Sequence, residues 1–333
     1  MPIQIISESE LRSCVFMDAE GFRAIADGFT EMARGNVTLP PILRIDIEDH
    51  RGEVDVKTAY IHGLESFAIK IAAGFLENYR LGLPTGSGMM VLVSAETGRP
   101  IALLLDNGYL TDLRTGLAGA VAADFLCRQA ITTAGVIGSG TQARFQIRGL
   151  AMVRSFERLL VYGIEPDAVV RYTKEMRAEL GIDVQIAESA EAVVRNSDVV
   201  VTCTPSREPY LRADWLHPGL HLTCMGSDSE DKQEVHAEVF EKVDRIVCDQ
   251  RDQCFRLGEL HHALEAGILS QDSEIFELGE LTSGEKPGRL DDSQITFCDL
   301  TGVGVQDTMI ARLAYQKASE LGLGIQIEGE NEV

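Results

Sequence analysis

The clearest chemical pattern in the sequence is the glycine series Gly138, Gly140 and Ala143, which reads G-x-G-x-x-A. It directly follows the apolar run TTAGVIG and precedes a helix-like segment. In a strand–turn–helix unit the first glycine makes the turn, the second lets a pyrophosphate approach the backbone, and the small third residue brings helix and strand together. The helix N-terminus then faces the negative charge. The pattern predicts a dinucleotide-binding turn, and a tight turn without a ligand is the alternative.

The next apolar run, RLLVYG, concerns the choice of dinucleotide. In NAD-binding proteins such a strand ends in an acidic residue that binds the ribose hydroxyls. Gly163 occupies this position, and Glu165 follows two residues later. Glu165 could bind the ribose and would repel the 2′-phosphate of NADP, whereas Arg171 lies too far along to be an obvious phosphate ligand. We expect NAD as the cofactor, with NADP as the alternative.

Asp228 is the candidate acid/base residue. It follows the apolar run LHLTCMG, at the carboxyl end of a predicted strand, where open α/β sheets bind their ligands. The alternative is that Asp228 caps a helix formed by the residues that follow it.

Arg44 and Lys70 are the candidate substrate anchors. Arg44 can bind a carboxylate through two hydrogen bonds. Lys70 alternates with Ile69 and Ile71, so if the isoleucines face the core, Lys70 faces a cavity or solvent. An ordinary surface lysine is the alternative. A proton carrier and a carboxylate anchor are what hydride transfer at a nitrogen-bearing carbon requires.

These residues must be positioned by two kinds of architecture. Residues 5–35 start with a capping signal, Ser7 to Glu10, and continue with helical spacing, so we expect one or two helices. Residues 41–105 have strand periodicity with Gly, Asn and Pro turns, which favours antiparallel pairing. Residues 111–129 form a predicted helix rich in small residues.

The second half of the chain has the alternating pattern of a parallel, doubly wound sheet. Six short apolar runs, mostly separated by helix-length segments, carry this pattern: TTAGVIG, RLLVYG, DVVVTCTP, LHLTCMG, RIVCD and TFCDLTG. We predict a Rossmann-type domain over residues 113–304 and an α+β substrate and dimerisation domain over residues 1–112, completed by a C-terminal helix at 305–325. A frayed polar tail is expected at 327–333.

Composition narrows the class of protein. A chain of 333 residues is long enough for two domains. The formal charge of −22 argues against nucleic acid and membrane partners, and no apolar stretch is long enough to cross a membrane, so we expect a cytoplasmic protein. Seven cysteines without CxxC spacing indicate reduced thiols. No metal is expected, because His261 and His262 lack partners at a ligand spacing, although Glu259 and Glu265 could pair with them along a helix.

Five ordered segments together resemble the ornithine cyclodeaminase/μ-crystallin family: FAIKIAAGF, TDLRTGLAGAVAA, VIGSGTQARFQ, CMGSDSEDKQEV and ITFCDLTGVGVQD. They span residues 40–310, and five motifs in order are far more specific than one. Four further phrases are similar to the ectoine-utilisation cyclodeaminase-like branch: PPILRIDI, GEVDVKTAY, LDNGYLTDLRT and RLGELHHALEAG.

The resemblance implies a homodimer and assigns roles to individual residues. Arg44 and Lys70 would bind the carboxylate of an amino-acid-like substrate, Asp55 would also contact this substrate, and Asp228 would act with Lys70 in catalysis. The implied cofactor-binding residues are Thr85, Arg114, Thr115, Gly138, Gly140, Thr141, Gln142, Glu165, Thr204, Met225, Lys232 and Thr301. Among these, Arg114, Thr141 and Gln142 would hold the pyrophosphate. Gly163 departs from the family, and Asp55 and Lys57 replace a glutamate and a methionine of the ornithine enzyme, which makes ornithine a doubtful substrate.

Three functions are therefore compared. The first is an NAD(P)-dependent imine/amine oxidoreductase that acts on a cyclic or unsaturated carboxylated intermediate of ectoine or hydroxyectoine degradation. The second is a cyclodeaminase that uses bound NAD to cyclise a diamino acid with release of ammonia. The third is a non-catalytic protein of the μ-crystallin type that binds NADPH and a small ligand. The presence of Arg44, Lys70 and Asp228 argues against the third.

Overall fold

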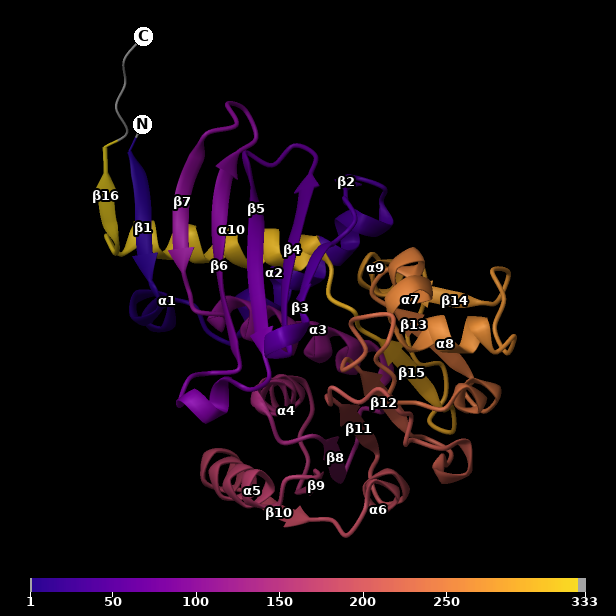
Figure 1. Ribbon diagram of the computed structural model, residues 1–333. Helices are drawn as coiled ribbons and strands as arrows, with labels where there is room; N and C mark the ends of the chain where they lie inside the picture. Colours follow the sequence, from indigo (N-terminus) through magenta and orange to yellow (C-terminus); the bar gives the residue numbers. More distant parts are fainter. Residues whose placement is uncertain (1, 329–333) are drawn as a thin grey trace. The chain divides into compact units, whose positions relative to one another are not determined.

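The computed structural model describes residues 2–328, which form two compact units (Figure 1). Unit 1 comprises the chain up to Arg114 together with the residues from Val303 onward. Unit 2 comprises Thr115–Gly302. Helix α3 (Tyr109–Leu126) begins in unit 1 and continues into unit 2.

The N-terminal part of unit 1 contains a strand and the two expected helices. Strand β1 (Ile3–Ser7) leads into α1 (Glu8–Cys14), and α2 (Ala19–Ala33) follows. The predicted capping box is present, because the Glu10 carboxylate accepts hydrogen bonds from the backbone and side chain of Ser7 at 2.9 and 2.6 Å. Strand β1 was not predicted. Five residues give little periodicity, and both strands that pair with β1, namely β7 and β16, lie far away in the sequence.

An eight-stranded sheet forms the centre of unit 1, with the order β16-β1-β7-β6-β5-β4-β2 and β3 paired to β4. Strands β3 to β7 pair antiparallel, as predicted. The elements are β2 (Val37–Thr38), β3 (Leu43–Ile47), the 3-10 turn η1 (Glu48–His50), β4 (Gly52–Ile61), β5 (Ser66–Phe75), η2 (Asn78–Leu81), β6 (Gly86–Ser94), β7 (Pro100–Leu105) and β16 (Ile325–Ile327).

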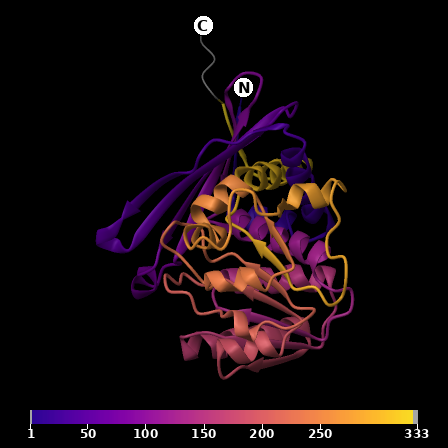
Figure 2. The same ribbon diagram turned by 90° about the vertical axis from the view of Figure 1, so that its right-hand side faces the viewer.

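The two faces of this sheet differ. Helices α2 and α10 (Gly304–Glu320) lie on one face, where Ala68, Met90 and Leu104 are fully buried (Figure 2). Thr308 of α10 donates a hydrogen bond to the carbonyl of Ala59 at 2.7 Å and so fixes the helix to β4. On the opposite face no helix of the described part of unit 1 is seen, and its apolar side chains are half-buried or exposed.

The C-terminal end differs from the expectation. Helix α10 ends at Glu320, and Ile325–Ile327 form β16, which pairs antiparallel with β1. The prediction of a tail frayed from residue 327 is therefore wrong at its start, because the backbone of these residues is satisfied by the edge of the sheet. Residues 329–333 of the predicted tail lie outside the described part of the chain.

Unit 2 contains a parallel sheet with the order β10-β9-β8-β11-β12-β15-β13-β14. All six predicted apolar runs are strands of it: β8 (Thr133–Ile137), β9 (Arg158–Tyr162), β11 (Val199–Thr202), β12 (His221–Cys224), β13 (Arg245–Cys248) and β15 (Thr296–Asp299). The two edge strands, β10 (Asp183–Ile186) and β14 (Ile275–Glu277), were not predicted, because they are short and partly polar.

Helices cover both faces of the sheet in unit 2 (Figure 1). One apolar cluster joins the sheet to helices α3 to α5, and a second joins it to helices α6 to α8. The further elements are α4 (Thr141–Val153), α5 (Pro166–Leu180), α6 (Ala190–Arg195), η3 (Ala213–Trp215), η4 (Ala237–Glu241), α7 (Arg251–Leu257), α8 (Glu259–Glu265) and α9 (Leu278–Thr282). This is the doubly wound arrangement that the sequence predicted. Within residues 2–328, no helix is both long and apolar enough to cross a membrane.

Candidate active site

The glycine turn has the conformation that a dinucleotide requires. Gly138 follows β8 with φ +114°, and a Cβ there would lie 2.9 Å from the carbonyl oxygen of Cys203, so only glycine fits. Gly140 is the N-cap of α4 and has no side-chain cap, and a Cβ on it would meet nothing within 4 Å. Open space in front of the α4 N-terminus, next to exposed Thr141, fits a pyrophosphate.

Arg144 supports this turn, and the sequence analysis missed it. Its guanidinium donates to the carbonyls of Ser139 and Gly140 at 2.8 and 2.9 Å, and it forms an ion pair with Glu175 of α5. An arginine directly after G-x-G-x-x-A was the only available signal. Its effect is to satisfy two carbonyls of the turn beside the helix N-terminus.

The ribose-binding candidates lie where the sequence places them. Gly163 follows the last residue of β9, and Glu165 is the exposed N-cap of α5 without a side-chain capping bond. The Glu165 carboxylate is therefore not engaged in capping its own helix. Its role at the ribose remains a prediction.

Three predicted cofactor residues follow neighbouring parallel strands. Thr204 comes after β11, Met225 after β12 and Thr301 after β15, and these strands are adjacent in the sheet. Their carboxyl ends therefore share one edge, where doubly wound sheets bind ligands. Thr115 lies earlier, on α3, and its carbonyl accepts a hydrogen bond from Gln146 of α4 at 2.8 Å. Gln142 is the second residue of α4.

Asp228 lies in the same region, in the loop after β12. No helix follows it at residues 227–234, so the alternative that Asp228 caps a helix is wrong. Its carboxylate instead accepts from Lys232 Nζ at 2.7 Å, with Asp228 about one third exposed and Lys232 mostly buried. A partly exposed carboxylate beside an ammonium group is suited to exchange a proton with a ligand.

Buried carboxylates hold the loops at this sheet edge. Asp249 accepts hydrogen bonds from the backbone of Thr301 and Gly302 at 2.9 and 2.6 Å. Asp299 accepts one from the backbone of Leu260 at 3.0 Å, while its other oxygen is buried without a hydrogen-bond partner. Burial, helped by the charge of Asp249, raises the pKa of Asp299 to about 8. Asp299 is therefore protonated at neutral pH.

Substituting Asp299 by asparagine should change how stability depends on pH. The folded state keeps the Asp299 acid neutral up to about pH 8, whereas the unfolded chain ionises it near its ordinary pKa of about 4. Its contribution to stability is thus fully present below pH 4 and is lost as the pH rises to about 8. Asparagine imitates the neutral acid and does not titrate. The free energy of unfolding, measured with urea at pH 5 and pH 8, should fall between these two pH values by a few kcal/mol less in D299N than in the wild type. An equal fall in both proteins would contradict the raised pKa of Asp299.

In unit 1, Lys70 and Arg114 converge on one buried carboxylate. Lys70 Nζ lies 3.0 Å and Arg114 Nε 2.9 Å from the same oxygen, Oδ1 of Asp307. Arg114 also donates to Gln306 at 2.9 Å. All three charged side chains are at least 94% buried. Two cationic side chains thus share one carboxylate oxygen, and such a group of donors suits an anionic ligand.

The pKa of Lys70 reflects this environment. Burial and the charge of Arg114 lower the pKa of the Lys70 ammonium to about 7, although Asp307 partly opposes the shift. Lys57, the cross-strand partner of Lys70 and also buried, contributes in the same direction as Arg114. Lys70 can therefore gain or lose its proton near neutral pH.

The condition under which the sequence analysis placed Lys70 in a cavity or in solvent is not met. Lys70 points to the helix-covered face and is 1% exposed, whereas Ile69 is half-buried and Ile71 is exposed on the opposite face. The alternation is confirmed, and the alternative of an ordinary surface lysine is wrong. Lys70 can be buried because Asp307, distant in sequence, balances its charge in the interior.

The remaining substrate candidates lie on β3 and β4, next to Lys70. Arg44 and Asp55 are cross-strand partners, and the two side chains approach to 3.8 Å. Arg44 also pairs with Glu53 and Asp46 at 2.5 and 2.9 Å. The charge of Arg44 is thus surrounded by three carboxylates, whereas Arg114 shares the single carboxylate of Asp307 with Lys70. Thr85 lies in the exposed segment before β6, and its carbonyl accepts from Phe75 at 2.7 Å.

The structure brings together one group of metal-ligand types that the sequence analysis set aside. One nitrogen each of His261 and His262 and a carboxylate oxygen of Glu265 lie within 4.8 Å of one another on α8. The other expected partner, Glu259, is fully buried and accepts backbone hydrogen bonds. His262 also bonds to the carbonyl of Lys232 at 2.8 Å, so this side chain contacts the loop of Asp228. The sequence signal for this group was that Glu265 follows His262 by three residues and His261 by four, which places the three side chains on one face of a helix.

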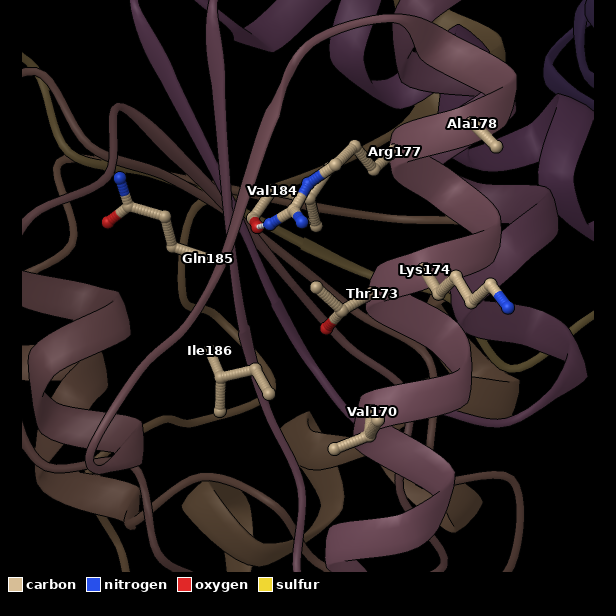
Figure 3. Close-up of a pocket in the computed structure, with 8 residues that line it drawn as sticks. All are labelled: Val170, Thr173, Lys174, Arg177, Ala178, Val184, Gln185 and Ile186. Carbon is tan, nitrogen blue, oxygen red and sulfur yellow. Dashed lines mark hydrogen bonds between the residues drawn. The ribbon is translucent and has the colours of Figure 1, made fainter.

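A groove of about 580 Å³ lies elsewhere in unit 2, between α5 and the edge strand β10 (Figure 3). Its lining is partly apolar and includes Val170, Lys174, Arg177 and Ile186. None of its lining residues is a predicted site residue. Because it flanks the outermost strand and not the carboxyl ends of the central strands, we do not assign the dinucleotide to it.

The described fold and residues define a class of protein. A doubly wound sheet with a pyrophosphate-type glycine turn and a separate unit with a buried cationic centre are the components of a dinucleotide-dependent enzyme.

Comparisons with known proteins make the assignment specific. The sequence profile of the ornithine cyclodeaminase/mu-crystallin family matches residues 3–322. The chain belongs to this family, so the predicted resemblance is confirmed. A Rhizobium meliloti protein named only as a dehydrogenase is 46% identical to this chain over 326 residues. The match covers 98% of this chain and 99% of the relative.

Two solved structures are similar over the whole chain. Δ1-pyrroline-2-carboxylate reductase of Thermococcus litoralis, in complex with NADH and L-proline, is 30% identical with a TM-score of 0.92, over 98% of this chain and 100% of that one. An archaeal alanine dehydrogenase dimer with bound NAD is 32% identical with a TM-score of 0.90, over 98% and 99%. These relatives confirm the predicted Rossmann-type fold, an enzyme, and a dinucleotide cofactor of the NAD type.

Proposed function

We propose that this protein is an NAD-dependent oxidoreductase that interconverts an imine and an amine next to a carboxylate. When bound, the nicotinamide supplies a hydride to the carbon of the C=N bond, or accepts it in the reverse direction. The observation that carries the proposal is the buried pair of Lys70 and Arg114 on Asp307, because two cationic side chains at one point can bind a carboxylate.

In this proposal Lys70 and Arg114 hold the substrate carboxylate, and Arg44 and Asp55 contact the substrate from β3 and β4. The role of Arg114 thereby differs from the pyrophosphate role that the resemblance implied. The reason is that its guanidinium shares Asp307 with the Lys70 ammonium and so belongs to the same cationic group. Fixing the carboxylate by two cations orients the adjacent C=N carbon, which is the main contribution of such an anchor.

Asp228 is the proposed proton carrier for the substrate nitrogen. Its carboxyl group donates a proton during reduction and accepts one during oxidation. Lys232, at 2.7 Å, stabilises the carboxylate after donation. Gly138, Gly140, Thr141 and Gln142 bind the pyrophosphate in this proposal, and Glu165 binds the ribose. Thr85, Thr115, Thr204, Met225 and Thr301 are the other proposed cofactor contacts.

The proposed substrate is a cyclic or unsaturated carboxylated imine. The Thermococcus relative, a reductase named for the cyclic imine Δ1-pyrroline-2-carboxylate and bound to L-proline, supports a cyclic substrate. The phrases typical of the ectoine-utilisation branch favour an intermediate of ectoine or hydroxyectoine degradation. Asp55 adds a negative charge close to Arg44, which suits a substrate with a second, cationic nitrogen.

The function is tested by mixing the purified protein with NADH or NADPH and a panel of substrates. The panel contains Δ1-pyrroline-2-carboxylate, a dehydroectoine-like compound and a diamino acid, and both reduced-cofactor absorbance and ammonia release are followed. Net oxidation of the cofactor with an imine is expected. Ammonia release from the diamino acid without net cofactor consumption would show cyclodeamination instead. Binding of cofactor and ligands without any turnover would show the non-catalytic alternative.

We also propose a homodimer formed through the open face of the unit 1 sheet. Cross-strand neighbours on this face are apolar and half-buried or exposed: Leu43, Ile45, Val56, Ile69, Ile71, Met89, Val91 and Leu103. Continuous apolar faces of this size are rare on monomers and are typical of interfaces. A second copy of the same face is the simplest partner, since a two-fold interface uses the same surface twice. The similar alanine dehydrogenase is a dimer.

Replacing Ile45 by aspartate should therefore dissociate the dimer. Ile45 is 53% exposed in the single chain, and a two-fold interface would bury two carboxylates at once. The dissociation constant should rise at least about 100-fold, which corresponds to about 3 kcal/mol. Light scattering should show twice the chain mass of 36.4 kDa for the wild type and the single mass for I45D. The control is I186D, an equally exposed isoleucine on β10. A monomeric wild type would refute the proposal.

A further inference from the structure

Glu234 is a buried carboxylate that the proposed chemistry does not yet use. It is 0% exposed and lies at the end of the loop that begins after β12 and contains Asp228. Five hydrogen bonds converge on its two oxygens. Thr204 donates its backbone and hydroxyl groups to Oε1, each at 2.7 Å, and Tyr210 donates to the same oxygen at 2.9 Å. Thr202 and Gly226 donate to Oε2 at 2.6 and 2.9 Å.

These hydrogen bonds join two loops of the carboxyl edge. Thr204 belongs to the loop after β11, and Gly226 starts the loop that carries Asp228 and Lys232. Glu234 ends that loop, so its bond to the Gly226 amide closes residues 226–234 into a ring. Two of the five donors are backbone amides, of Thr204 and Gly226, so each oxygen of Glu234 accepts from one loop whether or not the group is ionised. Burial raises the pKa of the Glu234 carboxyl, and the hydrogen bonds from Thr202 and Thr204 oppose this shift.

The packing around Gly226 confirms that this contact is tight. A Cβ on Gly226 would lie 2.2 Å from the carbonyl oxygen of Thr204 and 2.5 Å from the Glu234 carboxylate. The two loops and Glu234 therefore meet at a point where no side chain fits. The backbone of Glu234 is itself fixed, because its amide donates to the buried Glu259 at 2.7 Å and its carbonyl accepts from Tyr210 at 3.0 Å.

A buried charge needs a reason, because an apolar residue of similar size is often as stable or more stable in its place. Here the reason is that backbone amides of the two loops need a hydrogen-bond acceptor. Loops at the carboxyl edge expose amides such as those of Thr204 and Gly226, and buried amides must be hydrogen-bonded. A single carboxylate satisfies both and thereby fixes the distance between the two loops.

We propose that Glu234 is a positioning residue, which holds the Asp228 loop against the Thr204 loop so that the proton carrier and the cofactor-lining threonine keep a fixed relation. The proposal rests on the proposed function for the roles of Asp228 and Thr204. The contact itself lies entirely within unit 2.

The test is the isosteric substitution Glu234→Gln. Its amide group can still accept from Thr204, but it presents N–H groups to Gly226, so the loop loses its closing bond. We expect faster amide hydrogen exchange in residues 226–233, with unchanged exchange in β12. We also expect kcat to fall about 10-fold to 100-fold, with a smaller rise in the KM for NADH. A merely structural role would lower the urea midpoint and leave kcat unchanged.

The matched control is Glu277→Gln. Glu277 is a half-buried glutamate of unit 2 that accepts from the backbone of Arg251 at 2.8 Å, and it belongs to neither loop. E277Q should leave kcat and the exchange of residues 226–233 unchanged. If E234Q does not fold, Thr202→Val is the second variant, because it removes the other donor to the Glu234 oxygen that Gly226 contacts. It should speed the exchange of residues 226–233 and lower kcat, each several-fold. Thr202 is fully buried and makes no proposed contact with the cofactor.

Two results would overturn the proposal. One is a folded E234Q whose exchange in 226–233 matches the wild type, and the other is a folded E234Q with kcat within twofold of it. Failure of the proposed function looks different. In that case the wild type turns over no member of the substrate panel, while the exchange comparison, which needs no substrate, still decides whether Glu234 orders the loop.

Discussion

Replacing Asp228 by asparagine should reduce kcat about 100-fold to 10,000-fold, because a positioned general acid contributes a factor of this size. Asparagine has nearly the same shape and can still accept from Lys232, which lies 2.7 Å from the carboxylate in the wild type. It cannot donate or accept the proton on the substrate nitrogen. The measurement is steady-state turnover of the imine that the panel identifies, together with a direct titration of NADH binding, which should change less than threefold.

The control for this substitution is Asp231→Asn in the same loop. Asp231 is half-exposed and pairs with Arg207, and it has no proposed role in proton transfer. D231N should keep kcat within a factor of about three. If D228N kept more than a tenth of the wild-type kcat, the proton would have to come from another group, and Lys70 would be the first candidate because its pKa is about 7.

Replacing Lys70 by methionine should raise the KM for the carboxylated substrate and lower kcat/KM about 100-fold or more. Removing one member of a buried charge pair costs about 2–5 kcal/mol, and each 1.4 kcal/mol is a factor of ten. Lys70 is 1% exposed and lies 3.0 Å from Asp307, so water cannot easily replace its charge. Methionine fills a similar volume, which limits the loss of packing.

The pH dependence gives a second test of the same residue. Lys70 binds a carboxylate only when protonated, and its pKa is lowered to about 7 by burial and by Arg114. In the free enzyme kcat/KM should therefore fall as the pH rises through about 7, and this alkaline limb should be absent in K70M. Lys174→Met, on the exposed side of α5, is the matched control. It should change neither kcat/KM nor its fall at alkaline pH. Weaker NADH binding in K70M would contradict a role limited to the substrate.

Much of the fold could be predicted because its signals are local. A strand, a glycine turn and a helix follow one another within about twenty residues around Gly138. The steric limits on φ favour glycine at this turn, whatever the tertiary context. The six central strands of unit 2 are short apolar runs that must be buried on both faces. Edge strands such as β10 and β14 escaped prediction because only one side of each is paired, so their sequences need not be apolar.

The candidate site was predicted in part, for the same reason. The position of Asp228 at the carboxyl end of a strand followed from the topology of parallel sheets, whereas Thr204 and Thr301 came from the family resemblance. Glu234 was missed because its role depends on five donors from three separate segments, and four of these donors lie 24 to 32 residues away in sequence.

The sequence by itself therefore determined the central strands of unit 2, most of the long helices and the place where a pyrophosphate can approach the backbone, since these follow from periodicity and from the conformational freedom of glycine. Only the tertiary structure decided which way Lys70 points. Its partner Asp307 lies 237 residues away, and Arg114 reaches the same oxygen from a different helix. Burial of a lysine depends on such long-range compensation of charge, which no local pattern contains.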